Sequence, residues 1–190
     1  MPEVVTTGYP FQIIQQGEPT IPTVTGMTAE SSGAGHHRTV VITFANTPLP
    51  LIDNAAVIAY GGLKVLDLPE GAIAFEGAVV ALAVTKSSAG VNTDWDGDFG
   101  VGTATAAADA TLSATEQNII PTTATPQAVA GATTAKGVAT AGLFVDGTTT
   151  PVGVYLNFLV DAVDHNVAGT ACNLILNGTL TLHYLFQGNH

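Results

Sequence analysis

The sequence predicts an all-β fold, a jelly-roll-like antiparallel β-sandwich with one short helix and an extended N-terminal arm. Apolar residues recur at every second position in several segments, which is the period of a strand with one buried face. Gly, Pro and Asp interrupt these runs at short intervals, as turn residues do. Thr and Val, which favour half-buried pleated surfaces, are frequent. Roughly eight such strands favour two sheets in a jelly roll.

The clearest strands lie at 152–160 and 174–186, on either side of a polar loop. In the second segment the apolar phase continues without a break through Asn177-Gly178. Asn-Gly is a strong signal for a tight hairpin, but the unbroken phase favours one long strand with Gly178 as a bulge. The residues expected to be buried together in the core are Leu156, Phe158, Leu180 and Leu182.

The remaining elements follow from local signals. Further strands are expected at 39–44, 55–60, 63–68, 72–84, 99–105 and 138–146. Gly61-Gly62 is interpreted as a turn and Gly77 as a bulge or a point of close backbone approach. Ser113 and Glu116 form a capping-box pattern, which predicts a helix of one or two turns ending before Pro121. The Thr-, Ala- and Pro-rich segment 122–136 is expected to be a loop or an irregular edge.

The chain is predicted to consist of an extended N-terminal arm at 1–36 and a jelly-roll sandwich domain at 37–190. Four prolines interrupt the arm and leave it at most one short edge strand. The arm is either a disordered tail or a segment that orders on a neighbouring subunit, and deleting residues 1–30 should then leave the melting temperature nearly unchanged. Trp95 either caps the sandwich or meets a partner. Possible interface residues are Phe11, Ile13, Ile14, Ile21 and Trp95.

Charge and composition exclude several functional classes. Fifteen acidic residues against four basic ones give a net charge of −11, which argues against nucleic-acid binding. No run approaches the roughly 18 apolar residues of a membrane span, and no basic-then-apolar signal opens the chain. The sequence therefore predicts a soluble protein made inside the cell, without a membrane partner. The single Cys172 excludes an internal disulfide and a thiolate metal cluster.

Three polar clusters were considered as reactive or metal sites. Asp94–Asp98 offers alternating carboxylates to a cation, but the Gly and Glu required by an EF-hand loop are missing. Asp161–Asn166 has the composition of an ordinary turn, and His36-His37 lacks the spacing that places two imidazoles on one metal. The chain also has no nucleophile or phosphate-loop motif. We therefore expect no enzyme activity, no catalytic residue, no metal and no cofactor.

Several phrases resemble the cement, or decoration, proteins of tailed-bacteriophage heads. They are YGGLKV at 60–65, LPEG at 68–71, DWDGDFG at 94–100, SATEQNIIP at 113–121 and VYLNFLVD at 154–161. The resemblance implies a non-enzymatic virion protein, made in the host bacterial cytoplasm, that binds the outer surface of an icosahedral capsid as a homodimer or homotrimer. It would bridge neighbouring major capsid subunits and stabilise the head. No ligand or catalytic residue carries over.

Two other classes remain open from the sequence. One is a carbohydrate- or receptor-binding jelly-roll module of a phage fibre or tail, because jelly rolls also serve as lectins. The scarcity of Trp and Tyr for stacking on sugars argues against it. The other is a virion enzyme, which the missing catalytic motifs make the weakest of the three.

Overall fold

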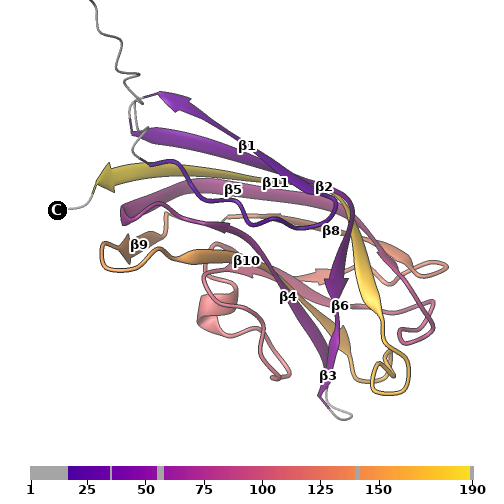
Figure 1. The fold of residues 1–190 in the computed structure, drawn as a ribbon. Coiled ribbons are helices and arrows are strands. Elements are labelled where there is room, and N and C mark those ends of the chain that lie inside the picture. The colour runs from indigo at the N-terminus through magenta and orange to yellow at the C-terminus, as the bar shows by residue number, and fades with distance from the viewer. Residues whose placement is uncertain (1–16, 35, 55–57, 140–141, 189–190) are drawn as a thin grey trace, which may run out of the picture.

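The computed structural model describes residues 17–34, 36–54, 58–139 and 142–188. They form two antiparallel sheets that enclose one hydrophobic core, so the expected all-β class is confirmed (Figure 1). The strands are β1 (Met27–Ala34), β2 (His37–Pro50), β3 (Ile52–Asn54), β4 (Ile58–Asp67), β5 (Gly71–Lys86), β6 (Gly97–Gly102), β7 (Ile120–Thr125), β8 (Ala132–Val138), β9 (Phe144–Gly147), β10 (Gly153–Asp161) and β11 (Asn173–Gly188). Within the described ranges, no helix is long and apolar enough to cross a membrane.

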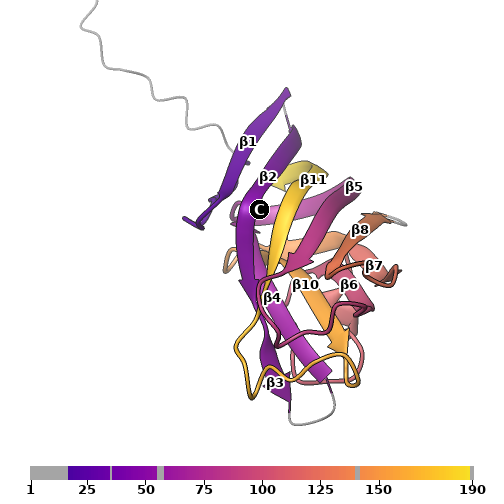
Figure 2. The ribbon, with the colours of Figure 1, turned by 90° about the vertical axis from the view of Figure 1, so that its right-hand side faces the viewer.

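The two sheets have a simple strand order. The six-stranded sheet runs β1-β2-β11-β5-β8, with β9 paired to β5 beyond the end of β8. Figure 2 shows β1, β2, β11, β5 and β8 side by side. The five-stranded sheet runs β3-β4-β10-β6-β7. Strands far apart in the sequence are therefore neighbours, since β11 lies between β2 and β5.

Strand β11 is continuous, as its apolar phase predicts. Its inward side chains are buried, and all four expected core residues, Leu156, Phe158, Leu180 and Leu182, have no exposed surface. The expected position of the bulge is wrong. Leu176 pairs with Thr47 and Asn177 with Ala45, so the extra residue is Asn46 on β2. Asn46 has a φ of 55°, and its N–H donates to Asn177 Oδ1 at 2.8 Å.

Close backbone approach explains the two glycines that were interpreted as a turn. Strand β4 passes straight through Gly61-Gly62, so the expected turn is wrong. A Cβ on Gly61 would lie 2.3 Å from Leu49 Cδ2, and one on Gly62 would lie 2.1 Å from Thr105 Oγ1. Glycine at these two positions leaves room for segments of the same chain that pack against the sheet. The bulge at Gly77 is confirmed, because His183 pairs with Gly77 and Tyr184 with Phe75.

The region after residue 112 differs most from the sequence-based expectation. A three-residue 3₁₀ turn, Ala114–Glu116, stands where a short helix was expected. Of the two expectations for 122–136, a loop or an irregular edge, the structure shows an edge, because this range contains most of β7 and β8, which are edge strands of the two sheets. Thr-rich segments suit strands, and the turn between the two strands holds Pro126. The strand expected at 138–146 is replaced by the end of β8 and by β9, both paired with β5.

The described part of the N-terminal segment contacts the sandwich. All eight residues of β1 pair with β2 and form the edge of the six-stranded sheet. Before β1, the Gly17 carbonyl accepts a hydrogen bond from the Tyr184 hydroxyl at 2.8 Å. Glu18 Oε1 lies 3.1 Å from Nε of the buried Arg38. Residues 17–26 therefore contact β11 near its C-terminal end, at Tyr184, and β2 near its first residue, at Arg38.

Candidate functional surface

The outer face of the five-stranded sheet is covered by the segment 103–119. Asn157 on β10, which is fully buried, fixes this segment. Its Oδ1 accepts from the Ala106 N–H at 2.8 Å, and its Nδ2 donates to the carbonyls of Ala104 at 2.9 Å and Glu116 at 2.8 Å. A small second core forms beneath the segment, made of Ile58, Ala106, Leu112 and Leu159. One face of the sandwich is thereby closed by the chain itself.

Glu116 stabilises the same segment through hydrogen bonds to other residues of the segment. Its buried carboxylate accepts hydrogen bonds from the Ala107 N–H at 2.9 Å and the Ser113 N–H at 2.6 Å. The capping box predicted from Ser113 and Glu116 is present around the 3₁₀ turn. Its role is to close a covering loop rather than to begin a helix. Sequence reasoning missed Asn157, because a single Asn in an alternating strand pattern carries no signal of what lies opposite.

The outer face of the six-stranded sheet carries no comparable cover in the described part of the chain. We call the outward side chains of β1, β2, β11, β5 and β8 the open face. Directly paired residues on antiparallel strands point to the same side, so the open face consists of rungs that cross the sheet. Five of them are Ala45–Asn177–Ala83–Thr134, Thr28–Thr43–Thr179–Ala81–Lys136, Glu30–Val41–Thr181–Val79–Val138, Ser32–Thr39–His183–Gly77 and Ala34–His37–Leu185–Ala74.

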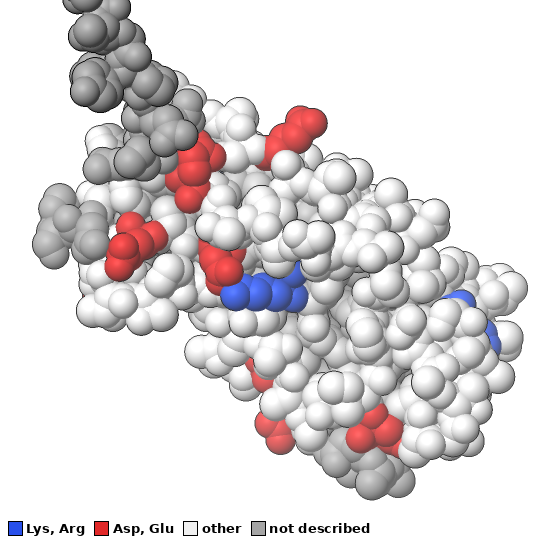
Figure 3. All heavy atoms as spheres, viewed as in Figure 1, with Lys and Arg blue, Asp and Glu red and all other residues white. Residues whose placement is uncertain are grey.

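The open face is nearly free of charge. Among its described side chains, the charged ones are Glu30, Glu76 and Lys136. Glu76 lies beside the bulge of β5, with Oε2 3.0 Å from Nδ1 of His37. The centre of the face consists of Thr, Ala, Val and Asn with His183. Figure 3, which has the orientation of Figure 1, shows that the side of the molecule turned to the viewer also carries separate acidic groups and few basic ones.

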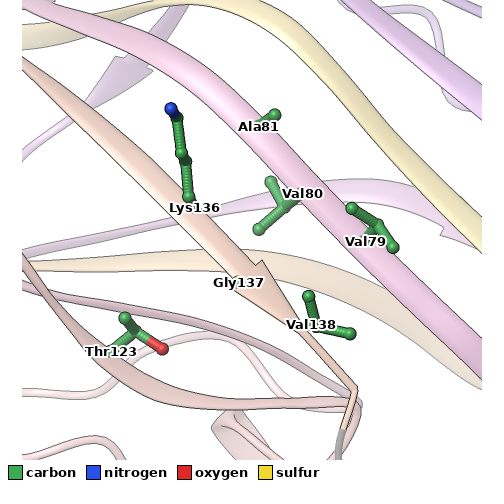
Figure 4. A pocket seen from close by; sticks show the side chains of 7 residues that line it. All are labelled: Val79, Val80, Ala81, Thr123, Lys136, Gly137 and Val138. Atoms are coloured by element: carbon green, nitrogen blue, oxygen red, sulfur yellow. The ribbon is translucent and has the colours of Figure 1, made fainter.

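A shallow apolar hollow lies where the open face meets the edge of the sandwich (Figure 4). It has a volume of about 500 Å³ and is formed by β5, β7 and β8. Val79 and Val138, which face each other across β5 and β8, are 46% and 62% exposed. Lys136 is the titratable residue of its lining, which otherwise consists of Val79, Val80, Ala81, Thr123, Gly137 and Val138. The hollow offers contact surface and a single amine, without the pair of groups that acid–base catalysis requires.

The acidic clusters at 94–98 and 161–166 lie together at one end of the sandwich. The Asp164 carboxylate accepts hydrogen bonds from Asn92 Nδ2 at 3.3 Å and the Asp96 N–H at 3.2 Å. Partial burial raises the pKa of Asp96, and the nearby carboxylates of Asp161 and Asp164 raise it further. Within the described ranges, no three His, Cys, Asp or Glu side chains are grouped so that they could hold a metal ion. The arrangement ties two loops together.

His165 is buried at the same end. Its side chain is 2% exposed, and its Nδ1 lies 3.5 Å from Oδ1 of Asp53 on β3. The other Asp53 oxygen accepts from the Ala168 N–H at 3.1 Å. These contacts hold the short edge strand β3 against the loop that leads to β11. Asp53 could not be predicted from the sequence, because its partner His165 lies more than a hundred residues away.

The sequence-predicted interface residues occupy different places. Trp95 has no exposed surface and donates from Nε1 to the Gly131 carbonyl at 3.3 Å, so the structure places it in the core. Of its two expected roles, the indole fills the first, in which it caps the sandwich. Ile21 is half-buried and packs on the same core. Phe11, Ile13 and Ile14 lie outside the described residues.

Comparison of the chain with protein-family models, with curated proteins and with solved structures finds no match. The candidate functional surface is therefore identified from the structure alone, and it is the open face.

Proposed function

We propose that this chain is a non-enzymatic structural protein of a phage virion. It binds the outer surface of an icosahedral capsid, bridges neighbouring major capsid subunits and stabilises the head. It is made in the host cytoplasm and works on the exterior of the virion as a homo-oligomer. The resemblance of five sequence phrases to phage cement proteins supports this assignment.

The observation that carries the proposal is the contrast between the two outer faces. One sheet is sealed by a loop that uses buried polar groups, Asn157 and Glu116, to stay in place. The other sheet presents a broad, nearly uncharged face of small side chains. Such a surface suits contacts between protein subunits, including those between copies of a virion protein that works as a homo-oligomer. The side chains that carry chemistry are instead used to fasten loops, as Asp164 and Glu116 do.

We further propose that the sandwich is a jelly roll. Consider the eight strands β2, β4, β5, β6, β7, β8, β10 and β11 in chain order. The first pairs with the last, the second with the seventh, the third with the sixth and the fourth with the fifth. This pairing supports a single long hairpin that is wound into two sheets with Greek-key connections.

The decisive experiment mixes the purified protein with expanded capsids that lack it. We expect saturable co-sedimentation, with a fixed number of copies per capsid, and a higher temperature of capsid disruption. An unrelated β-sandwich protein of similar net charge is the control for adsorption. Absence of saturable binding would reject the proposal. If the same preparation bound to a glycan array and left capsids undecorated, the receptor-binding alternative would replace it.

A further inference from the structure

The open face has the dimensions of a protein interface. The five rungs hold 22 positions, and with strands about 4.8 Å apart and rungs about 6.7 Å apart they define an area of roughly 700 Å². A standard protein–protein interface buries about 800 Å² on each partner. The face also suits close packing, because the small residues Gly77, Ala81 and Ala83 on β5 lie opposite His183, Thr179 and Asn177 on β11. Two such faces can pack as the sheets of a sandwich do, about 10 Å apart.

Charge determines which partner fits. The whole chain carries −11, so two copies repel one another over most orientations. On the open face, by contrast, two carboxylates and one ammonium leave a net charge of −1. Two copies that meet face to face therefore bring together their least repulsive surfaces.

The positions of the charges select one orientation. Glu30 lies on β1 at one edge of the sheet, and Lys136 lies on β8 at the opposite edge, one rung away. A two-fold axis parallel to the strands, running over β11, places β1 of each copy over β8 of the other. Glu30 then lies within reach of Lys136 of the second copy, and the symmetry makes this contact twice. An axis in the plane of the face and perpendicular to the strands would instead place β1 over β1 and β8 over β8, which separates Glu30 from Lys136 of the other copy.

We propose that the open face is a self-association surface, on which two copies pack about a two-fold axis parallel to the strands with Glu30 of each copy paired to Lys136 of the other. Thr179 and Thr181 on β11 lie next to this axis and meet their own counterparts. The hollow beside Val79 and Val138 then receives the β1 edge of the second copy. Contacts with any larger assembly fall to the other surfaces of the protein.

A charge-swap cycle on the full chain tests the pairing. Sedimentation equilibrium at low salt measures the dimer dissociation constant of the wild type, E30K, K136E and the double variant. Each single variant creates two like-charge contacts and should raise the dissociation constant about five- to thirty-fold. The double variant restores opposite charges and should return to within about three-fold of the wild type. Within one chain the two residues lie four strands apart, so rescue reports contact between copies.

The single variants also separate specific pairing from net charge. E30K makes this acidic protein less negative, so a general charge effect would strengthen association, whereas the proposed pair predicts weakening. D109K, an exposed change of the same size on the segment that covers the other sheet, is the matched control. T181E should abolish the dimer, because the new carboxylate meets its own copy near the axis. Thermal unfolding confirms that every variant is folded.

Several results would overturn the inference. They are a wild type that stays monomeric at hundreds of micromolar, a trimer, a double variant no tighter than the singles, or a T181E variant that still dimerises. Decoration of capsids is a separate outcome. A dimer with the predicted charge cycle that leaves capsids bare would remove the proposed function and leave this inference standing. A trimer that decorates capsids would remove this inference and leave the proposed function standing.

Discussion

Asn157 shows how much one side chain can fix in this molecule. It satisfies three backbone groups of the covering segment from a fully buried position on β10. Truncation leaves the Ala106 N–H and two carbonyls without partners, and each buried unsatisfied group costs about 1–3 kcal/mol.

We therefore expect Asn157→Ala to lower the free energy of unfolding by at least about 3 kcal/mol. Urea denaturation at a fixed protein concentration measures it. Asn166→Ala, at an exposed position, is the control and should change stability by less than about 0.5 kcal/mol. Similar small losses at both positions would show that the segment is held by other contacts.

The acidic end of the sandwich should make stability depend on pH. Burial and the carboxylates of Asp161 and Asp164 raise the pKa of Asp96 above its ordinary value of 3.8. The folded state therefore binds this proton more tightly than the unfolded state does. Ionisation of Asp96 costs stability as the pH rises from 3.8 through the folded-state pKa, and that cost persists at neutral pH.

Asp96→Asn should accordingly stabilise the protein at pH 7, by up to about 0.5 kcal/mol because the group is partly solvated. The gain should vanish below pH 3.8, where the wild-type carboxyl is protonated in both states. Melting curves of the two proteins across this range measure the difference, with Asp109→Asn as the exposed control. A variant that is less stable than the wild type at pH 7 would contradict the repulsion argued here.

At the scale of elements, Gly77 on β5 and Gly178 on β11 should respond very differently to substitution by alanine. Gly178 has a φ of 138°, and a Cβ there would lie 2.2 Å from the Ala81 carbonyl oxygen. A Cβ on Gly77 would meet nothing closer than His183 Cδ2 at 3.9 Å. Both glycines lie in long strands, and both were interpreted as bulges from sequence.

Gly178→Ala should therefore destabilise the protein by more than about 2 kcal/mol. Gly77→Ala should remain within about 1 kcal/mol of the wild type, because the space is open and alanine restricts the unfolded chain. Chemical denaturation of the two variants side by side gives the comparison. Equal losses would mean that the continuous path of β11 past Ala81 is not what requires Gly178.

Elements with a strict apolar phase could be predicted, and elements defined by their neighbours could not. Strands β10 and β11 were evident because one face of each is buried along its whole length. The Gly61-Gly62 pair resembled a turn in the sequence. Glycine is required there because Leu49 and Thr105, from elsewhere in the chain, approach the strand closely. The range of β7 and β8 could be predicted no further than a loop or an irregular edge, because short Thr- and Ala-rich edge strands have weak alternation.

The same distinction holds for the functional surface of the whole molecule. The sequence indicated a protein without catalytic groups, but the open face emerges only when one hairpin, β1–β2, and three long-range strand pairings place Thr, Ala and Val in common rungs. Each acidic cluster could be recognised in the sequence, but the hydrogen bonds by which Asp164 joins the two could not. Spacing along the chain reports local structure, whereas these surfaces join segments that are far apart in the sequence.

The N-terminal segment provides a prediction for the whole molecule. From the sequence alone, deletion of residues 1–30 was expected to leave the melting temperature unchanged. The contacts now predict the opposite, because the deletion removes Glu18 beside the buried Arg38, the Gly17 acceptor of Tyr184 and half of β1.

We expect the 1–30 deletion to lower the melting temperature by about 5–10 °C, the shift that corresponds to a loss of roughly 3 kcal/mol in a chain of this size. Differential scanning calorimetry measures the shift. Deletion of residues 1–16, which removes none of the contacts described above, is the matched control. A 1–30 deletion that melts with the wild type would show that β1 and the preceding segment add little to the fold.

The pairing of β2 with β11 also has a consequence for biosynthesis. The first long strand leaves the ribosome early, but its central neighbour is the last strand to be made. Because translation adds about 5–20 residues each second, β2 waits many seconds before its partner emerges. The surface across which two copies would meet has β11 at its centre, so a nascent chain has no such surface. If copies associate through this surface, association must therefore wait until β11 has been made, which would limit premature contacts between nascent chains on one polysome.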